Sequence, residues 1–375
     1  MAPNEVPLRT FEKRIRAGGG GVPIRVGIVG CGAVARRAHV PAWLDHPSAA
    51  LVALCDPVPE ASRTIAARFG LSCPMYESLE ALLETSRPDV LDICSPGFLH
   101  VEQTRRALEA GCHVLVEKPP APGPEQAEEL ARLARSRGLK LGAVFNYRYR
   151  DLVMRLKEAI EKGAVGAPVK VYITHHGPVV FTDAPWLWDE RRSKYLVWEF
   201  GIHFIDVLVH LLGPHERLVH VLPIEQLSLG HTTDLEVTVS FANGALGRLE
   251  ITQDTTRHSS FFTQVNLYGT AADAFVRWFP PSFRLVAGQV SPLKLVWEEV
   301  ASVSSVAVKL LRGTHRRDRN ISHHRLIAAY ADWILGRANY PLTFEAVLPT
   351  LRLLAEIERE VPTYRAASSA AASRS

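Results

Sequence analysis

The most informative spacing in this 375-residue chain is a glycine-rich turn between an apolar stretch and a helical stretch. Residues 24–29 are followed by Gly30-x-Gly32-x-x-Ala35. Gly30 permits a tight turn, Gly32 lets backbone N–H groups approach a pyrophosphate, and Ala35 allows close helix–strand packing. The helix N-terminus favours a phosphate group. The pattern predicts a dinucleotide site formed by Gly30, Cys31, Gly32, Ala33, Val34 and Ala35.

An acidic residue, Asp56, ends the next apolar stretch. A carboxylate at this position accepts hydrogen bonds from the 2′-hydroxyl of the adenosine ribose, which distinguishes NAD from NADP. Arg36 and Arg37 follow the turn and favour the 2′-phosphate of NADP instead. Because Asp56 repels that phosphate and is followed by Pro57 and Val58, we expect NAD, with NADP as the alternative.

Three polar clusters follow later strands that we expect in the same sheet: 95–100, 117–120 and 146–149. The carboxyl ends of parallel strands meet at one edge, which is where ligands bind. We therefore expect the cofactor to meet Ser95, Pro96, His100, Glu117 and Lys118, and the substrate to meet Lys118 and Arg148. For His100 and Arg148, a solvated loop position is an equal alternative.

A polar stripe marks the second half of the chain. Glu199, His203, Asp206 and His210 recur at i, i+4, i+7 and i+11 of a helix expected over 197–212. A histidine with a pKa of about 6.5 can take or give a proton at neutral pH. A core histidine, or a zinc site made by Glu199, His203, Asp206 and His175 or His176, is the alternative; we expect no metal.

Taken in order, these motifs resemble those of the glucose–fructose oxidoreductase, inositol dehydrogenase and rhizopine-catabolism (Gfo/Idh/MocA) family. The shared motifs are Gly-x-Gly-x-x-Ala, Cys-Asp-Pro, Ser-Pro-Gly-x-x-His, Glu-Lys-Pro, Asn-Tyr-Arg and Trp-x-x-Glu-x-Gly-x-His-x-x-Asp. The resemblance covers roughly residues 24–360, and Glu-Lys-Pro is its most specific part.

The resemblance implies roles for several residues. Lys118 lies at the substrate oxygen beside the nicotinamide, often before a cis peptide bond, and His203 lies over the reacting carbon with Glu199 orienting it. The acid at the position of Glu199 is usually aspartate, and Ser193-Lys194-Tyr195-Leu196 replaces small glycines, so the substrate pocket differs. Trp188 is expected to stack on a sugar ring, or else to lie in the core or an interface. The substrate residues expected are Lys118, Arg148, Trp188, Glu199, His203 and Asp206.

The elements that must position these residues alternate in the first part of the chain. Strands are expected at 24–29, 50–55, 73–76, 90–94, 113–117 and 140–145, with helices between them, which predicts a doubly wound parallel sheet of Rossmann type. After a helix at 151–162, strands follow one another with short turns, near 168–175, 217–223, 234–242, 245–253, 262–269, 273–278 and 283–287. Two late helices, 321–336 and 344–360, complete an α+β domain with a mostly antiparallel sheet.

The chain length suggests two domains. We expect a flexible extension at 1–23, the dinucleotide domain at 24–146, a substrate and dimerisation domain at 147–365, and a disordered tail at 366–375. Five scattered cysteines and the lack of a signal sequence or a long apolar run predict a cytoplasmic protein without a membrane span. A net charge of +4 does not indicate nucleic acid. The basic segment 309–325 is either a solvated loop or a contact for phosphorylated substrates or acidic membranes.

These features predict an NAD(P)-dependent oxidoreductase that moves a hydride between nicotinamide and a secondary alcohol or ketone of a sugar, nucleotide sugar or cyclitol. By resemblance, it forms a homodimer or homotetramer through the exposed face of its second sheet. The alternative is a dinucleotide-sensing regulator without catalysis on the same scaffold.

Overall fold

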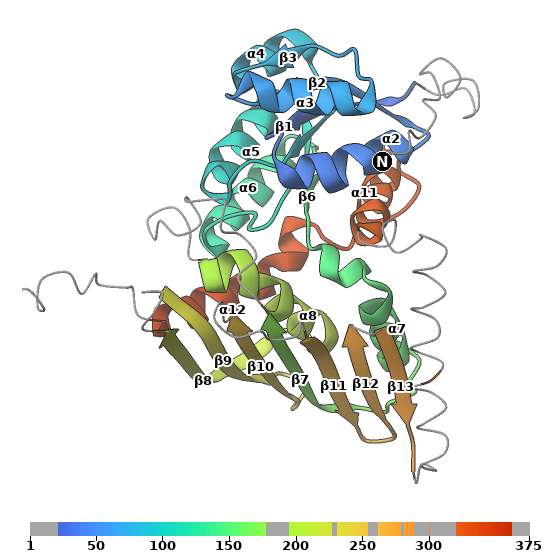
Figure 1. Ribbon diagram of the computed structural model, residues 1–375, viewed down its shortest axis with the longest axis vertical. Coiled ribbons are helices and arrows are strands. Elements are labelled where there is room, and N and C mark those ends of the chain that lie inside the picture. Colours follow the sequence, from blue (N-terminus) through green and yellow to red (C-terminus); the bar gives the residue numbers. More distant parts are fainter. Residues whose placement is uncertain are drawn as a thin grey trace, which may run out of the picture. The chain divides into compact units, whose positions relative to one another are not determined.

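The computed structural model describes residues 22–177, 195–226, 231–253, 262–278, 281–288, 300 and 320–361. The chain divides into two units (Figure 1). The first contains Met1–Tyr149 and Arg319–Val347, and the second contains Arg150–Asp318 and Leu348–Ser375. The expected extension and tail, Trp188 and most of the basic segment lie outside the described residues.

A parallel six-stranded sheet forms the centre of the first unit, in the order β3-β2-β1-β4-β5-β6. This is the Rossmann order, in which the connections reverse direction between β1 and β4 and leave a crevice at their carboxyl ends. The strands confirm the expected positions within a few residues: β1 (Ile24–Val29), β2 (Ala49–Cys55), β3 (Met75–Tyr76), β4 (Val90–Ile93), β5 (His113–Val116) and β6 (Leu141–Ala143).

Helices cover this sheet, with α5 and α6 on one side and α2 and α11 on the other (Figure 1). Nearly all residues of β1, β4 and β5 are buried, because helices cover both faces of the sheet. The connecting helices are η1 (Ala35–His39), α2 (Val40–Asp45), α3 (Pro59–Phe69), α4 (Leu79–Ser86), η2 (Gly97–Leu99), α5 (His100–Glu109), α6 (Pro124–Ser136) and η3 (Asn146–Tyr149). The first of these is a π-helical segment rather than the regular α-helix that the sequence predicts.

Helix α11 (Ile321–Ile334) belongs to the first unit, whereas the sequence assigns it to a continuous second domain. Its buried face contains Leu326, Ile327 and Tyr330. The Tyr330 ring packs edge-on against Trp43 with centroids 6.4 Å apart. Through this packing α11 belongs to the first unit, although it follows the strands of the second sheet in the sequence.

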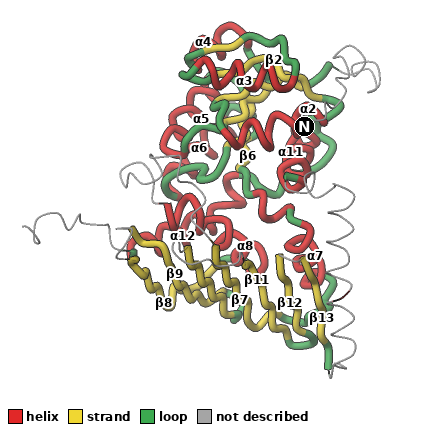
Figure 2. Tube along the Cα trace, in the orientation of Figure 1, coloured by secondary structure: helices red, strands yellow, loops and turns green. Residues whose placement is uncertain are grey.

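A seven-stranded sheet forms the second unit, in the order β13-β12-β11-β7-β10-β9-β8. It is antiparallel except where β7 pairs with β10. Figure 2 shows it as one layer with α7, α8 and α12 (Phe344–Glu360) against it. The strands and α7 lie near their expected positions: α7 (Asp151–Glu161), β7 (Pro168–Gly177), β8 (His215–Gln226), β9 (His231–Phe241), β10 (Leu246–Gln253), β11 (Phe262–Gly269), β12 (Asp273–Trp278) and β13 (Pro281–Val286).

The helix expected over 197–212 is two elements, a π-helical segment η5 (Tyr195–Gly201) and the α-helix α8 (Ile202–Leu212). Gly201 explains the wider turn, because a Cβ at this residue would lie 2.6 Å from the carbonyl oxygen of Leu196. The extra residue in a π turn rotates Glu199 away from the direction that an uninterrupted α-helix would give it.

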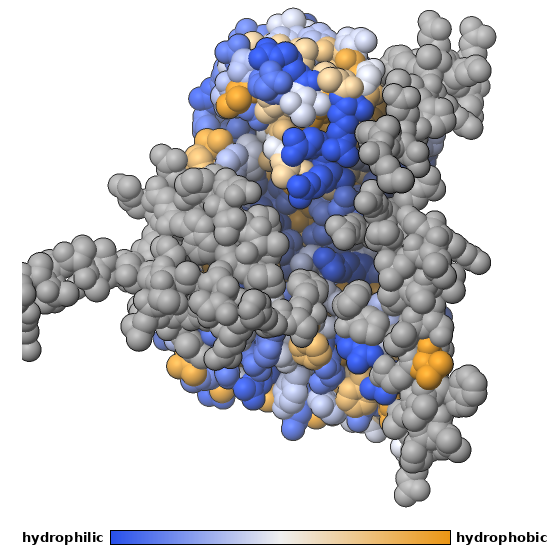
Figure 3. Space-filling view, viewed as in Figure 1, coloured by the Kyte–Doolittle hydropathy of each residue, from blue (hydrophilic) through white to orange (hydrophobic). Residues whose placement is uncertain are grey.

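On the visible face in Figure 3, described hydrophobic and hydrophilic residues are intermixed. Among the described residues, no helix is both long and apolar enough to span a lipid bilayer. All five cysteines are free thiols, and four of them are buried.

Candidate active site

The glycine-rich turn lies at the carboxyl end of β1, next to the end of β4. Gly30 has a φ of +86°, and a Cβ there would lie 2.5 Å from the backbone nitrogen of Ser95. Glycine is therefore required for the close approach of the two strand ends. A Cβ on Gly32 would meet no atom within 4 Å, so protein packing does not require this second glycine. The open space beside Gly32 fits the pyrophosphate role that the spacing predicts.

Asp56 follows β2 and is held against the same turn. Its Oδ2 accepts a hydrogen bond of 2.8 Å from the Cys31 N–H, and its Oδ1 accepts one of 2.9 Å from the Val58 N–H. These bonds fix the carboxylate at the edge where the ribose of a dinucleotide binds. The turn, the helix beginning after Gly32 and the anchored acid together fit NAD.

Burial keeps the neighbouring thiols protonated. It raises the pKa of Cys31 to about 11 and that of Cys55 to about 12. Neither side chain is therefore a nucleophile at neutral pH.

His100 is buried and joins two of the predicted polar clusters. Its Nδ1 lies 2.7 Å from the carbonyl oxygen of Pro119, and its Nε2 lies 2.8 Å from the carbonyl oxygen of Ser95. The ring thus bridges the segments that follow β4 and β5. Its contact with the cofactor remains a prediction, and its location indicates that it holds these two segments together.

Lys118 follows β5, and its side chain is partly exposed. The Lys118–Pro119 peptide bond is cis, as the resemblance implies. The Lys118 N–H donates a hydrogen bond of 3.0 Å to Oε2 of Glu117, which fixes the backbone where the chain leaves the strand.

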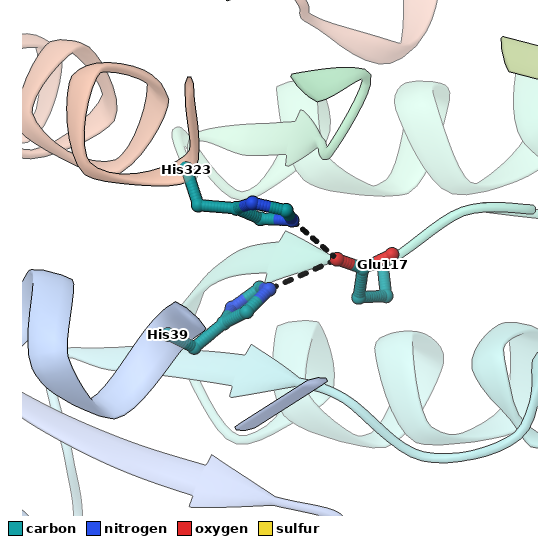
Figure 4. A group of neighbouring side chains, drawn as sticks. All are labelled: His39, Glu117 and His323. Atoms are coloured by element: carbon teal, nitrogen blue, oxygen red, sulfur yellow. Dashed lines mark hydrogen bonds and ion pairs between the residues drawn. The ribbon is translucent and has the colours of Figure 1, made fainter. Parts of the chain in front are cut away.

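The carboxylate of Glu117 is surrounded by two histidines from distant parts of the chain (Figure 4). Its Oε1 lies 2.9 Å from Nε2 of His39 and 3.7 Å from Nε2 of His323. The other ring nitrogen of His39, Nδ1, lies 2.8 Å from Oδ2 of Asp92. The Trp43 N–H donates to the same Asp92 oxygen at 2.7 Å.

This network sets the charges of its members. Burial alone would lower the pKa of His39, but the adjacent Asp92 outweighs it and holds that pKa well above its usual value. Burial alone would raise the pKa of Glu117, but hydrogen bonds from His323 and His39 hold it well below its usual range. The imidazolium of His39 therefore lies between two carboxylates.

The sequence prediction missed His39, Asp92, Trp43 and His323. One signal was available, because Asp92 interrupts the apolar run of β4 and a buried carboxylate requires partners. The contribution of His323 depends on the return of α11 to the first unit, which no local pattern indicates.

In the second unit, the residues of the polar stripe differ in their burial and in their hydrogen bonds. His203 is partly exposed and Glu199 is buried. Asp206 is completely buried and accepts a hydrogen bond of 2.9 Å from the Thr350 hydroxyl. Trp198 is also buried, and its N–H donates a hydrogen bond of 2.7 Å to Glu358, which indicates a packing role.

His175 lies under this helix, where burial lowers its pKa to about 4. Its Nδ1 lies 2.8 Å from the Thr263 hydroxyl. His203 lies in the second unit and Lys118 in the first. Their roles at one substrate carbon stay a prediction.

Arg148 lies in η3 and is partly exposed, with its guanidinium 6.0 Å from the centre of the Phe145 ring. Its contact with substrate also stays a prediction.

Among the described residues, two groups have possible metal-ligand atoms within 4.8 Å of one another: His39–Glu117–His323 and His39–Asp92–Cys94. Neither includes Glu199, His203 or Asp206, so the structure gives no support to a zinc site on the polar stripe.

Two family models match this chain. Residues 24–145 match the oxidoreductase family, NAD-binding Rossmann fold, and residues 153–274 match the GFO/IDH/MocA C-terminal domain. Together they account for more than half of the chain.

Curated relatives match about half of this chain. D-glucoside 3-dehydrogenase of Escherichia coli (strain K12) is 34% identical over 196 residues, 51% of this chain and 54% of the relative. Inositol 2-dehydrogenase of Rhizobium meliloti (strain 1021) is 28% identical over 190 residues, 51% of this chain and 55% of the relative. The chain thus spans about half the length of these relatives.

Solved structures share the fold over most of the chain. The WlbA dehydrogenase from Bordetella pertussis, in complex with NADH and UDP-GlcNAcA, has a TM-score of 0.76 at 22% identity and covers 90% of this chain and 95% of its own. GenD2 from gentamicin A biosynthesis, in complex with NAD, has a TM-score of 0.71 at 18% identity and covers 96% of both chains.

Proposed function

The chain belongs to the Gfo/Idh/MocA oxidoreductase family, and from this premise we propose that it is an NAD-dependent dehydrogenase or reductase acting on a CH–OH group of a sugar, nucleotide sugar or cyclitol. The observation that carries the proposal is the position of Lys118. This lysine directly follows the Glu117-anchored end of β5, in the sheet whose carboxyl edge holds the Gly30 turn.

The chemistry divides between the cofactor and the side chains. When bound, nicotinamide supplies or accepts the hydride. Lys118 donates a hydrogen bond to the substrate oxygen and stabilises the negative charge that develops on it. In the oxidative direction, His203 takes the hydroxyl proton as the carbon gives up its hydride and becomes a carbonyl, with Glu199 orienting the ring. Reduction reverses each transfer.

The relatives suggest where to search for substrates. Named relatives include a D-glucoside 3-dehydrogenase, an inositol 2-dehydrogenase and a dTDP-3,4-didehydro-2,6-dideoxy-alpha-D-glucose 3-reductase. The panel should therefore contain free sugars, glycosides, cyclitols and nucleotide sugars, each offered with NAD and NADP in both directions. The readout is the absorbance of reduced nicotinamide.

We expect NAD-dependent turnover with at least one of these classes. The alternative function, a dinucleotide-sensing regulator, predicts cofactor binding without turnover on any of them. It also predicts unchanged binding in Lys118→Ala, so the two outcomes are distinct.

We also propose a cytoplasmic homodimer or homotetramer that uses the outer face of the second sheet. This face carries a partly exposed aromatic group, in which the Tyr268 ring lies 5.6 Å from Tyr172 and 6.0 Å from Phe275. Light scattering of the wild type and of Tyr268→Lys tests the proposal, which requires the substitution to dissociate the oligomer.

A further inference from the structure

His39 has a carboxylate on each side of its ring. Nδ1 lies 2.8 Å from Asp92 and Nε2 lies 2.9 Å from Glu117, and both carboxylates are almost completely buried. A neutral imidazole has only one N–H, so it can donate to one of these two partners. Two hydrogen bonds to two ionised carboxylates require both ring nitrogens to be protonated.

The charges favour the same arrangement. A buried carboxylate without a partner is costly, and two of them beside a neutral ring are more so. The imidazolium of His39 compensates one negative charge at hydrogen-bond distance from both acids. The titratable groups that face the His39 ring are Asp92 on β4, Cys94 after β4, Glu117 after β5 and His323 on α11.

The Glu117 carboxylate connects His39 to the backbone of Lys118. Oε1 of Glu117 faces His39 and His323, which leaves Oε2 to accept the Lys118 N–H at 3.0 Å. One peptide later, the carbonyl oxygen of Pro119 is 2.7 Å from the ring of His100. The segment that carries Lys118 is thus held on both sides by buried histidines.

We propose that His39 is a positioning residue. It holds the Glu117 carboxylate, and through it the Lys118 backbone, in the geometry in which the Lys118 amine donates a hydrogen bond to the substrate oxygen. This inference rests on the proposed role of Lys118. His323 contributes a second, longer contact to the same carboxylate oxygen, so its effect is smaller.

Two substitutions of one position separate this role from general stability. The amide nitrogen of glutamine can replace Nε2 of histidine, and that of asparagine can replace Nδ1. His39→Gln should therefore keep the contact with Glu117, whereas His39→Asn should keep the contact with Asp92 and lose the one with Glu117. Both remove the positive charge, so a purely structural role predicts similar losses.

The first test is a comparison of kcat, KM and the Kd for NAD among these variants. Because a displacement of about 1 Å can cost up to roughly 100-fold in rate, we expect His39→Asn to lower kcat roughly 10- to 100-fold. His39→Gln should stay within about fivefold of the wild type, and KM and Kd should change little in both. Equal kcat values per folded molecule in the two variants would overturn the proposal.

Controls and a readout without turnover complete the design. His324→Ala, at the residue next to His323 and with a partly exposed side chain, should leave kcat unchanged. In protein labelled with [15N]lysine and [15N]histidine, the Lys118 amide should be protected from hydrogen exchange in the wild type and in His39→Gln, and unprotected in His39→Asn. The His39 ring should show two N–H protons.

These readouts separate the possible failures. If the wild type shows no turnover but the Lys118 amide is protected in the wild type and His39→Gln and unprotected in His39→Asn, only the proposed function is refuted. An amide that is equally protected in both variants refutes the positioning role, whatever the activity. The ligand atoms of His39, Glu117 and His323 are also close enough to share a divalent ion. If the wild type contains one equivalent of zinc and His323→Ala does not, a zinc ion rather than the His39 imidazolium holds Glu117, and the proposal is overturned.

Discussion

The carboxylate of Asp56 and the backbone N–H of Cys31 are joined by a hydrogen bond of 2.8 Å that ties the end of β2 to the turn after β1. The carboxylate is held from its other oxygen by the Val58 N–H. A negative charge is thereby fixed beside the glycine-rich turn. We expect it to accept the ribose hydroxyl of NAD and to repel the 2′-phosphate of NADP.

Asp56→Asn should weaken the preference for NAD by about tenfold, which corresponds to about 1.4 kcal/mol. The amide oxygen can still accept the Cys31 N–H, so the turn should keep its shape while the negative charge is lost. Titration of both cofactors, followed by fluorescence, measures the two Kd values.

Asp89→Asn is a matched control, because Asp89 accepts the Arg25 N–H at 2.8 Å at the opposite end of the sheet. Its Kd ratio should equal that of the wild type. An unchanged ratio in Asp56→Asn would remove Asp56 as the residue that selects the cofactor.

Gly30→Ala should lower the stability of the protein, whereas Gly32→Ala should lower its affinity for NAD. At Gly30 the new Cβ would meet the Ser95 backbone at a positive φ, so we expect a loss of roughly 2–4 kcal/mol in the free energy of unfolding. At Gly32 it meets no protein atom, so stability should change by less than about 1 kcal/mol while the affinity for NAD falls. Thermal unfolding and NAD titration test the pair, and normal NAD affinity in stably folded Gly32→Ala would contradict the proposed pyrophosphate position.

The first sheet could be predicted almost completely because its signals are local. Each strand is a short apolar run, and Gly30, Gly32 and Asp56 have fixed positions relative to such runs. Predictions were less complete where distant parts of the chain meet. The contact of Glu117 with His39 joins residues 78 positions apart, and α11 adds His323 from the far end of the sequence.

His175 should make stability fall in acid. Burial lowers its pKa to about 4, with smaller effects of His176 and Arg150, whereas an unfolded histidine has a pKa of about 6.5. Between these values the unfolded chain binds a proton that the folded chain does not, so stability rises with pH in this window. From pH 7.5 to pH 5 the wild type should lose about 2 kcal/mol through this residue.

Urea unfolding at the two pH values measures this loss, and His175→Gln should remove it. The partly exposed His324 supplies the control, because His324→Gln should keep the pH dependence of the wild type. The same dependence in His175→Gln and in the wild type would contradict the assignment.

Asp206 and His203 should give opposite results although both lie on the predicted polar stripe. Asp206→Ala leaves the buried Thr350 hydroxyl without its acceptor, so we expect a loss of about 1–3 kcal/mol in the free energy of unfolding and little change in KM. His203→Ala should lower kcat by at least tenfold and leave stability almost unchanged. Unfolding curves and steady-state kinetics of both variants test this. A raised KM in stable Asp206→Ala would contradict the structural role and support the predicted contact of Asp206 with substrate.

The stripe also shows why helix periodicity was an incomplete guide. The spacing of Glu199 and His203 predicts that they share one face of an α-helix, but the turn that contains Glu199 is π-helical. The signal for the wider turn was Gly201, whose missing Cβ admits the Leu196 carbonyl oxygen, but a single glycine also fits the family motif and did not distinguish the two geometries.

The most direct test of the account is the rate of hydride transfer in Lys118→Met, which keeps the length of the apolar stem of the side chain and removes its amine. With a substrate found in the panel, we predict that kcat falls by roughly 100- to 10,000-fold while the Kd for NAD stays within about threefold of the wild type. Lys157→Met, on the surface of α7, should retain full activity. A kcat for Lys118→Met within twofold of the wild type would contradict the central claim that this amine stabilises the negative charge that develops on the substrate oxygen.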